Sequence, residues 1–570
     1  MGTMGDALAS ATTASEISSF FIDELGYISV KRYGATGDGT TDDKSFLDTA
    51  AAALSDGDRM FFPNGTYLIA GENQYVTIDE DNVVIEGSGG AAIATENSTS
   101  LEVLTDPHYC GLAISGDNVT IRNLNFRGGL ISVSTTGTIT IEGCKFYNLH
   151  NAGIAFSSTV AFKKAVIKDC IFEYSLATDA GNYTSIQRGS EAADAWAETV
   201  IVKDCTFRGT SGGVNMHKTK HVIVDGCKFM GVDVNCVKQS VNNQKLTIIN
   251  CEFDGAAIDA ASANRHINAV SDYAIFCQVL YNVTIENNKF FNYSGLATIW
   301  LTDGSFMDGI VNIKHNTFDT CIAPFSLPQG NACIRDNKFE NCGTASTGIS
   351  ICEAITWGRK IEFDHNYLLN TKVKIGSHGE YGHTYIYIRK NSIKYNLDNN
   401  GAIQIYNQGL GADNIVAYFV EDNEIEITDS KSYGIVCESL QPVYSRDNVV
   451  TGAAVAAELY TTNSRNKIVD DAITGANTLA ANVYGDATTV INTSATGNIA
   501  YTLSASFPIG ARVNVQMTHA TRTLTFLVSG GTISGHATCV AGAQYTTALL
   551  VKETATTWGI YSQVGTWSYT

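Results

Sequence analysis

The hexapeptide Ile141-Glu142-Gly143-Cys144-Lys145-Phe146 decides the fold, because its pattern occurs thirteen times between residues 119 and 452. Each copy has an apolar residue, two mostly polar residues, then usually Cys or Asn, any residue, and a bulky apolar residue. The fourth positions are Leu124, Cys144, Cys170, Cys205, Cys227, Cys251, Asn288, Asn316, Asn337, Asn366, Asn391, Asn423 and Asn448. The sixth positions are Phe126, Phe146, Phe172, Phe207, Phe229, Phe253, Phe290, Phe318, Phe339, Leu368, Ile393, Ile425 and Val450.

The spacing of the copies predicts a coil of strands. Successive copies lie 20 to 37 residues apart, with a mean of 27 between Phe126 and Val450. A repeat of this length is typical of a solenoid, and short units rich in β-branched residues indicate strands. Equal positions would stack about 4.8 Å apart. Asn would then hydrogen-bond up its column and tolerate the bend between two strands, while the rings would pack inside. We therefore predict an all-β chain built on a right-handed, single-stranded parallel β-helix of thirteen or more rungs.

Composition excludes several classes of partner. The formal net charge of −20 argues against nucleic acid and anionic membranes as partners. No run of about 18 apolar residues occurs, and no basic segment followed by an apolar one opens the chain, so we expect no membrane span and no signal peptide. We find no P-loop, no G-x-S-x-G motif and no cluster of three Asp on adjacent rungs. We therefore predict no cofactor and no metal.

Residues 28–43 read Ile-Ser-Val-Lys-Arg-Tyr-Gly-Ala-Thr-Gly-Asp-Gly-Thr-Thr-Asp-Asp. They predict a strand, a Gly-Asp-Gly turn, and a helix of about a dozen residues capped by Thr41 or Asp42. Residues 57–69, which contain Phe-Pro-Asn-Gly-Thr-Tyr, predict a strand, a turn and another strand. This segment resembles the opening of pectate-lyase-like proteins. With the rungs that follow, the chain resembles a bacteriophage tailspike, which degrades a bacterial capsule or lipopolysaccharide. The resemblance implies that Asp38, Asp42 and Asp43 are structural and close the N-terminal end of the coil.

The resemblance also implies an assembly and a location. We expect a homotrimer on the virion, as part of the phage tail, assembled in the host cytoplasm and acting on capsular polysaccharide at the bacterial surface. It would attach to the phage tail, or to another tail protein, through its N-terminus.

The repeat divides the chain into segments. The apolar residues of the first segment fall on one helical face, which would pack on the core or meet copies of itself as a neck. The last segment has short alternating runs with frequent turns, which predict a C-terminal β-sandwich for trimerisation or carbohydrate binding. The predicted segments are 1–26 (neck or attachment helix), 27–118 (pectate-lyase-like cap), 119–455 (catalytic or binding β-helix), 456–486 (connector) and 487–570 (β-sandwich).

Glycoside hydrolysis requires two carboxylates, about 6.5–9.5 Å apart in inverting enzymes. We aligned the strands that follow the repeated phrase by their first inward residue, which sets Val234 level with Ile275, Ile299 and Ile349. Asp303 and Glu353 then share one offset, two rungs and about 9–10 Å apart. Trp300 would project outward beside Asp303 as a platform for a sugar ring, and His378 would donate to a leaving group or an acidic sugar.

Other residues offer alternatives to this pair. Asp233 and Asp272 are competing catalytic carboxylates, with Asp259 beside them and Asp308 and Glu438 weaker. Arg265, His266 and Tyr273 would bind the anionic group of a uronate or pyruvylated sugar. We favour hydrolysis of a capsular polysaccharide. The alternatives are a lyase acting by β-elimination on a uronate-containing capsule and a non-catalytic glycan-binding adhesin.

Overall fold

The structure is a computed structural model. It describes residues 27–71, 73–95, 110–149, 152–175, 184–189, 195–232, 235–240, 244–256, 273–278, 282–293, 298–302, 309–321, 324–327, 331–342, 349–351, 360–377, 384–396, 401–407, 415–428, 433–438, 443–451, 463–470, 475–479, 488–492, 499–503, 509–517, 523–528, 530–542 and 546–570. The chain forms two compact units. Unit 1 comprises residues 1–284 and 288–296, and unit 2 comprises residues 285–287 and 297–570. The neck helix predicted for residues 1–26 lies outside the described residues.

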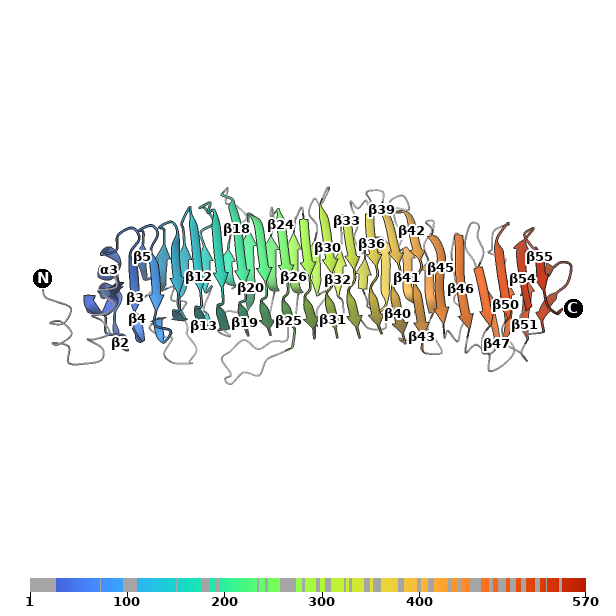
Figure 1. Cartoon of the computed structure of the whole chain (residues 1–570), viewed down its shortest axis with the longest axis horizontal. Coiled ribbons are helices and arrows are strands. Elements are labelled where there is room, and N and C mark those ends of the chain that lie inside the picture. The colour runs from blue at the N-terminus through green and yellow to red at the C-terminus, as the bar shows by residue number, and fades with distance from the viewer. Residues whose placement is uncertain are drawn as a thin grey trace. The chain divides into compact units, whose positions relative to one another are not determined.

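Unit 1 is a parallel β-helix in which each rung contributes three strands (Figure 1). From β3 onward, strands of this unit pair in parallel with the third strand further along the chain, for example β11 with β14, β12 with β15 and β13 with β16. Ile131 thus lies beside Ile154, and Phe146 beside Phe172. The predicted parallel β-helix is confirmed.

The strands of unit 1 form three sheets, named by their order within a rung. The first-strand sheet holds β5 (Tyr75–Ile78), β8 (Gly111–Ile114), β11 (Leu130–Val133), β14 (Ile154–Phe156), β17 (Thr184–Arg188), β20 (Gly212–His217), β23 (Asn235–Ser240) and β26 (Tyr273–Gln278). The second-strand sheet holds β1 (Tyr27–Ser29), β3 (Arg59–Phe62), β6 (Val84–Gly87), β9 (Val119–Arg122), β12 (Thr138–Glu142), β15 (Lys164–Lys168), β18 (Ala197–Lys203), β21 (Thr219–Asp225) and β24 (Lys245–Ile249), while β27 (Asn282–Glu286) is divided between the units. The third-strand sheet holds β2 (Asp38–Asp42), β4 (Gly65–Ile69), β7 (Ala91–Thr95), β10 (Asn125–Arg127), β13 (Lys145–Leu149), β16 (Ile171–Ser175), β19 (Thr206–Arg208), β22 (Lys228–Met230), β25 (Glu252–Asp254) and β28 (Lys289–Phe291).

Unit 2 repeats this arrangement. Its first-strand sheet holds β29 (Ile299–Thr302), β32 (Phe325–Leu327), β35 (Ile349–Ile351), β38 (Val373–Ser377), β41 (Gly401–Asn407) and β44 (Tyr433–Glu438). Its second-strand sheet holds β30 (Ile310–Lys314), β33 (Asn331–Arg335), β36 (Lys360–Asp364), β39 (Thr384–Arg389), β42 (Ile415–Glu421) and β45 (Val443–Thr451). Its third-strand sheet holds β31 (Thr317–Asp319), β34 (Lys338–Glu340), β37 (Tyr367–Leu369), β40 (Ser392–Tyr395) and β43 (Glu424–Ile427).

The C-terminal part of unit 2 forms two sheets around a shared core that includes Phe526, Leu550 and Trp558. Its strands are β46 (Asn463–Asp470), β47 (Gly475–Leu479), β48 (Thr488–Asn492), β49 (Ile499–Leu503), β50 (Arg512–Met517), β51 (Leu524–Val528), β52 (Thr532–Ile533), β53 (Thr538–Ala541), β54 (Thr546–Lys552), β55 (Thr557–Val564) and β56 (Trp567–Tyr569). β46 pairs in parallel with β45, so the stacking continues into the segment predicted to connect the coil to the sandwich. Antiparallel pairing begins with β50 and β54 and with β51 and β53.

The N-terminal end of unit 1 carries the 3-10 helix η1 (Val30–Tyr33) and the helix α3 (Lys44–Ala52), which contacts β5 (Figure 1). The predicted cap of this helix was wrong, because Asp43 occupies the N-cap position in place of Thr41 or Asp42. The Asp43 carboxylate is buried and accepts hydrogen bonds from the backbone N–H groups of Thr36 and Gly37 at 2.6 and 3.1 Å. It therefore fixes the preceding turn.

Asp38 is also structural. Its carboxylate accepts hydrogen bonds from the backbone N–H groups of Thr40 and Thr41, both at 2.8 Å, and these bonds lower its pKa. The roles of Asp38 and Asp43 agree with the structural function that the resemblance implies. No group of three potential metal ligands occurs among the residues that the structure describes. In the same described part of the chain, no helix has the length and apolar character needed to cross a membrane.

The bend inside the repeated phrase corrects a second expectation. We assigned the tight bend to Asn at the fourth position, but the residue at the third position is the one with a left-handed backbone. It has a positive φ in all thirteen copies: Asn123, Gly143, Asp169, Asp204, Gly226, Asn250, Asn287, His315, Asp336, His365, Lys390, Asp422 and Asp447. The fourth side chain is thereby turned into the coil, where it is buried.

Candidate carbohydrate-binding surface

Trp300 lies on the outer face of the first-strand sheet in unit 2. Its neighbours Ile299 and Leu301 are almost fully buried, whereas Trp300 is half-buried, as alternation along β29 requires. Parallel pairing places Trp300 beside Ser326, and the next two pairings place Ser350 and then Lys374 at the same position. The outward positions of successive rungs therefore form one row.

The alignment that selected the predicted carboxylates is confirmed in its backbone. Ile299 pairs with Phe325. Ser326 and Leu327 pair with Ser350 and Ile351, which sets Phe325 level with Ile349. Ile299 and Ile349 therefore occupy equal positions two rungs apart. β32 is the strand between them. Asp303, Glu353 and His378 themselves lie outside the described residues, so their roles stay predictions.

Lys374 and Gln404 extend the Trp300 row. Lys374 pairs with Gln404 across β38 and β41, and Gln404 is half-buried between the fully buried Ile403 and Ile405. Lys372 precedes β38 and is only 1% exposed. Burial, together with the nearby charge of Lys374, lowers the pKa of Lys372 to about 8. The row thus combines an indole, an amide and an ammonium group, with a second amine buried beside it.

Unit 1 presents a similar row on its own first-strand sheet. Gln187, Asn215, Lys238 and Phe276 occupy paired outward positions on β17, β20, β23 and β26. The Lys238 ammonium lies 5.7 Å from the centroid of the Phe276 ring, which is a cation–π distance. Among the described outward side chains of these two rows, none is a carboxylate. Each row therefore offers a cation beside an aromatic ring or an amide, the groups that bind hydroxyls and acidic substituents of sugars.

Most of the remaining predicted residues belong to unit 1, while Asp308 and Glu438 belong to unit 2, where only the backbone of Glu438 is described, at the end of β44. The backbone of Tyr273 begins β26 and pairs with Asn235. Asp233, Arg265, His266, Asp272 and the weaker alternative Asp259 lie outside the described residues, as does Asp308 in unit 2. The frame assumed for β23 was wrong, because Val237 pairs with Ile275 where the alignment had used Val234. Asn235 and Cys236 are both buried, so this stretch lacks the alternation that would have fixed its register.

Sequence reasoning overlooked Lys238 and Lys374. Both directly follow an inward residue, Val237 or Val373, which is the offset at which Trp300 follows Ile299. The alignment that selected Trp300 would have found Lys374 as well, had it been read for cations as well as carboxylates. Lys238 could not be found in this way, because the frame of its strand was misassigned.

Residues 27–262 match the model of the family described as rhamnogalacturonase A/epimerase, pectate lyase-like. Plasmin and fibronectin-binding protein A of Streptococcus pneumoniae (strain ATCC BAA-255 / R6) is 25% identical over 347 residues, which are 55% of this chain and 42% of that protein. The chain therefore spans less than half the length of this curated relative.

Two solved structures are also similar. ORF18 of Geobacillus virus E2 is 18% identical with a TM-score of 0.37, and the match covers 59% of this chain and 61% of that chain. The A-module of the mannuronan C-5 epimerase AlgE6 of Azotobacter vinelandii is 13% identical with a TM-score of 0.32, covering 74% of this chain and 98% of that module. The family match and the observed coil agree with the resemblance carried by the motif in residues 28–67, because residues 27–262 are similar to the pectate-lyase-like family.

Proposed function

We propose that this protein is a polysaccharide depolymerase of the phage tailspike type, which binds and cuts a bacterial capsular polysaccharide. The observation that carries the proposal is the outward row of Trp300, Lys374 and Gln404 on a parallel β-helix. Trp300 and Lys374 are three rungs apart, or about 14 Å, a span that suits several sugar units. The family description, which names a rhamnogalacturonase and an epimerase, supports a polysaccharide as the substrate class.

The proposed reaction is hydrolysis by Asp303 and Glu353. One carboxylic acid would protonate the leaving oxygen of the glycosidic bond, and the other carboxylate would take a proton from the attacking water. A spacing of two rungs, about 9–10 Å between the backbones, leaves room for that water and favours inversion at the anomeric carbon. Trp300 would hold a sugar ring beside the pair, and His378 would assist the leaving group.

The proposed setting is the virion. We infer a homotrimer that is attached to the phage tail, or to another tail protein, through its N-terminus and acts at the cell surface. Neither nucleic acid nor membrane is proposed as a partner, since the chain carries a net charge of −20.

The test is depolymerisation of a panel of purified capsular polysaccharides, followed by new reducing ends. Asp303→Asn and Glu353→Gln should each lower the rate by about 10² or more, while binding of the intact polymer is retained. Glu426→Gln is the matched control. Glu426 is an exposed carboxylate that pairs with Lys394, and both residues lie on the third-strand sheet, away from the proposed active site. The assignment is overturned if neither amide variant slows cleavage. A chain that binds a capsule and releases no new ends would be an adhesin.

β-Elimination is the second candidate, and Lys372 and Lys374 favour it. A lyase needs a base near neutral pH and a cation that neutralises the uronate carboxylate. Lys374, which is half-buried in the outward row, would supply the cation. Lys372, with its pKa lowered to about 8, would supply the base after its buried amine turns outward to the polymer. The base would remove the proton at C5, and the bond between C4 and the leaving oxygen would break as the C4–C5 double bond forms. Ultraviolet absorbance of an unsaturated uronate, lost in Lys372→Met, would establish this reaction and exclude hydrolysis.

A further inference from the structure

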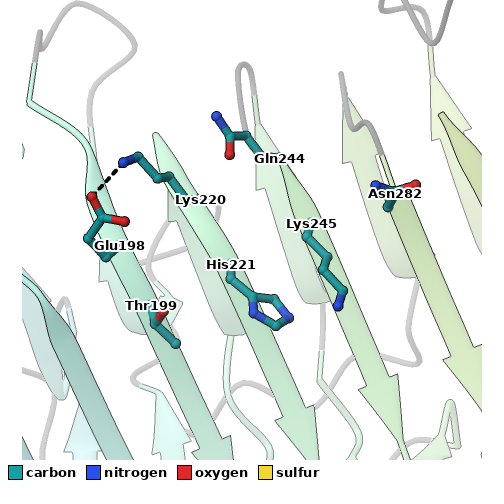
Figure 2. A pocket seen from close by; sticks show the side chains of 7 residues that line it. All are labelled: Glu198, Thr199, Lys220, His221, Gln244, Lys245 and Asn282. Carbon is teal, nitrogen blue, oxygen red and sulfur yellow. Dashed lines mark hydrogen bonds and ion pairs between the residues drawn. The ribbon is translucent and has the colours of Figure 1, made fainter. Parts of the chain in front are cut away.

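A polar groove lies on the second-strand sheet of unit 1. It opens over the beginnings of β18, β21 and β24, has a volume of about 590 Å³, and is drawn in Figure 2. Its lining residues are Glu198, Thr199, Lys220, His221, Gln244, Lys245 and Asn282. None of these residues belongs to the first-strand sheet that carries the proposed active site.

Parallel register builds the floor of this groove. Thr199 pairs with His221, and His221 pairs with Lys245, so three side chains from successive rungs form one row. Figure 2 shows the imidazole of His221 lying between Thr199 and Lys245. The N–H of Asn282 donates to the carbonyl of Gln244 at 3.0 Å, which brings the two amide-bearing residues together.

The charges in the groove leave one cation available. Lys220 pairs with Glu198, the carboxylate that lines the groove, at 2.5 Å (Figure 2). Lys245 is exposed, and no described carboxylate lies within 4.0 Å of its ammonium group. Lys245 is distinguished from other exposed lysines by its place in the groove, beside His221 and Gln244. The groove is therefore suited to an anion that brings its own carboxylate.

His221 adds a titratable group beside that cation. Its Nε2 lies 3.3 Å from Thr247 Oγ1. Burial, and then the charge of Lys245, lower its pKa below the usual 6.5, so the imidazole is neutral at pH 7. The charged groups around it are Lys245 on β24, Glu198 on β18 and Lys220 on its own strand. Protonation at lower pH would add a second positive charge next to Lys245.

We propose that this groove binds the carboxylate of an acidic sugar unit, with Lys245 as its ionic partner and the amides of Gln244 and Asn282 as donors to the neighbouring hydroxyls. The site would hold an acidic glycan on the second-strand sheet, apart from the site of cleavage. The proposal rests on the proposed function only in taking the bound polymer to be a glycan.

The test measures binding of oligogalacturonate, a uronic acid oligomer, to the full chain carrying Asp303→Asn and Glu353→Gln. We expect Lys245→Met to weaken binding about tenfold, since it removes a charge-assisted contact. We also expect the carboxyl-reduced oligomer to bind poorly. Lys228→Met is the matched control, because Lys228 is exposed on β22 outside the groove. The proposal is overturned if the parent chain does not bind oligogalacturonate, if Lys245→Met binds as tightly as the parent, or if the reduced oligomer binds equally well.

A pH series separates this groove from general surface charge. Affinity of the parent should rise as the pH falls below about 6.5, because His221, whose pKa is lowered, gains a proton there while uronate carboxylates remain ionised. His221→Asn should abolish this rise, so that the affinity of the variant stays the same across the pH series. An equal rise in the His221→Asn variant would show that the imidazole takes no part. Cleavage of capsule by the chain with its native Asp303 and Glu353 is a separate measurement, so failure of the depolymerase proposal would leave these outcomes interpretable.

Discussion

The fourth position of the repeat is filled differently in the two units, although the backbone around it is the same. In unit 2 a column of buried asparagines runs through Asn316, Asn337, Asn366, Asn391, Asn423 and Asn448. In unit 1 the column is Cys144, Cys170, Cys205, Cys227 and Cys251, beneath Asn288. Since the residue before each has a positive φ in both units, the side chain alone distinguishes the two columns.

The asparagine amide and the cysteine thiol face the equivalent backbone carbonyl of the preceding rung, but the amide forms the stronger hydrogen bond. Asn337 Nδ2 donates to the carbonyl of Ile313 at 2.9 Å, and Cys170 Sγ lies 3.6 Å from the carbonyl of Ile141, which is the equivalent atom. The amide also has an oxygen, and that of Asn337 accepts both the backbone N–H and the Nδ2 of Asn316 at 3.0 Å. A thiol is a weak donor and a weak acceptor. The asparagine column therefore supplies strong bonds between rungs, and the cysteine column supplies weak ones.

The sixth position of the repeat also differs between the units, because the column of stacked rings is longer in unit 1. Seven rings, from Phe126 to Phe290, stack with centroids 4.6 to 4.9 Å apart and interplanar angles of 2° to 9°. In unit 2 the sixth position holds Phe318 and Phe339 and then smaller aliphatic residues from Leu368 to Val450. The comparison indicates two ways to hold equivalent turns: packing of rings in unit 1 and hydrogen bonding of amides in unit 2.

The largest effect is expected from Asn391→Ala. The substitution would remove the acceptor of the Asn366 backbone N–H and the donor to the Phe363 carbonyl, and would break the amide bonds to Asn366 and Asn423. Each buried group left without a partner costs about 1–3 kcal/mol, so we expect a loss of roughly 5 kcal/mol in local opening free energy. Hydrogen exchange of peptides from β36 to β43 measures it. Asn312→Ala, at a half-buried outward position on β30, is the control. A loss below about 1 kcal/mol would contradict the importance of the amide column.

Phe207→Ala tests how much the stack of phenylalanine rings stabilises unit 1. Phe207 is fully buried and stacks between Phe172 and Phe229, at 4.9 and 4.6 Å. Truncation should cost about 4 kcal/mol through lost burial and the cavity left behind, measured by hydrogen exchange of β16, β19 and β22. Ile223→Ala, at a half-buried outward position, should cost about 1 kcal/mol. Equal losses for the two variants would mean that the ring stack contributes nothing special.

The columns of the repeat also explain which features of the fold could be predicted from the sequence. Identical residues at fixed offsets predicted the coil, the stacked rings and the frame shared by Ile299 and Ile349, because a parallel ladder forces equal positions together. The left-handed third position was missed, although twelve of its thirteen residues are Gly, Asn, Asp or His, the types that adopt a positive φ most often. The signal was present in the sequence, and only Lys390 adopts this conformation against its intrinsic preference.

The candidate site was less predictable than the coil. The outward row could be derived for Trp300, since Ile299 and Leu301 alternate with it. It could not be derived for Lys238, since buried polar residues obscure the period of β23. The groove around His221 was also missed, because its residues come from separate rungs and are ordinary surface types when taken singly. Only the register of β18, β21 and β24 brings them together.

A smaller effect is expected from Cys227→Ala. The Cys227 sulfur lies 3.5 Å from the carbonyls of Val202 and Asp225, so only weak bonds and a small apolar contact are lost. We expect a cost of roughly 1–2 kcal/mol, measured by hydrogen exchange of β19, β22 and β25. Cys227→Ser, which keeps a donor of similar size, should lie within about 1 kcal/mol of the native chain. A loss of local opening free energy as large as that of Asn391→Ala would contradict the claim that the cysteine column forms weaker bonds than the asparagine column.

The smallest effect is expected where the columns meet, from Cys251→Asn. The Cys251 backbone N–H already donates to Asn288 Oδ1 at 2.8 Å, and its sulfur lies 3.6 Å from the carbonyl of Val224. A new amide would therefore find that carbonyl and Asn288 Oδ1 as acceptors, and the change in local opening free energy should stay within about 1 kcal/mol. Cys170→Asn is the matched variant, because Cys144 and Cys205 offer sulfur where an amide needs oxygen. Cys170→Asn should be the more destabilising of the two by about 1 kcal/mol, measured by hydrogen exchange of β13, β16 and β19. The reverse order would show that an asparagine column does not depend on having asparagine as its neighbour.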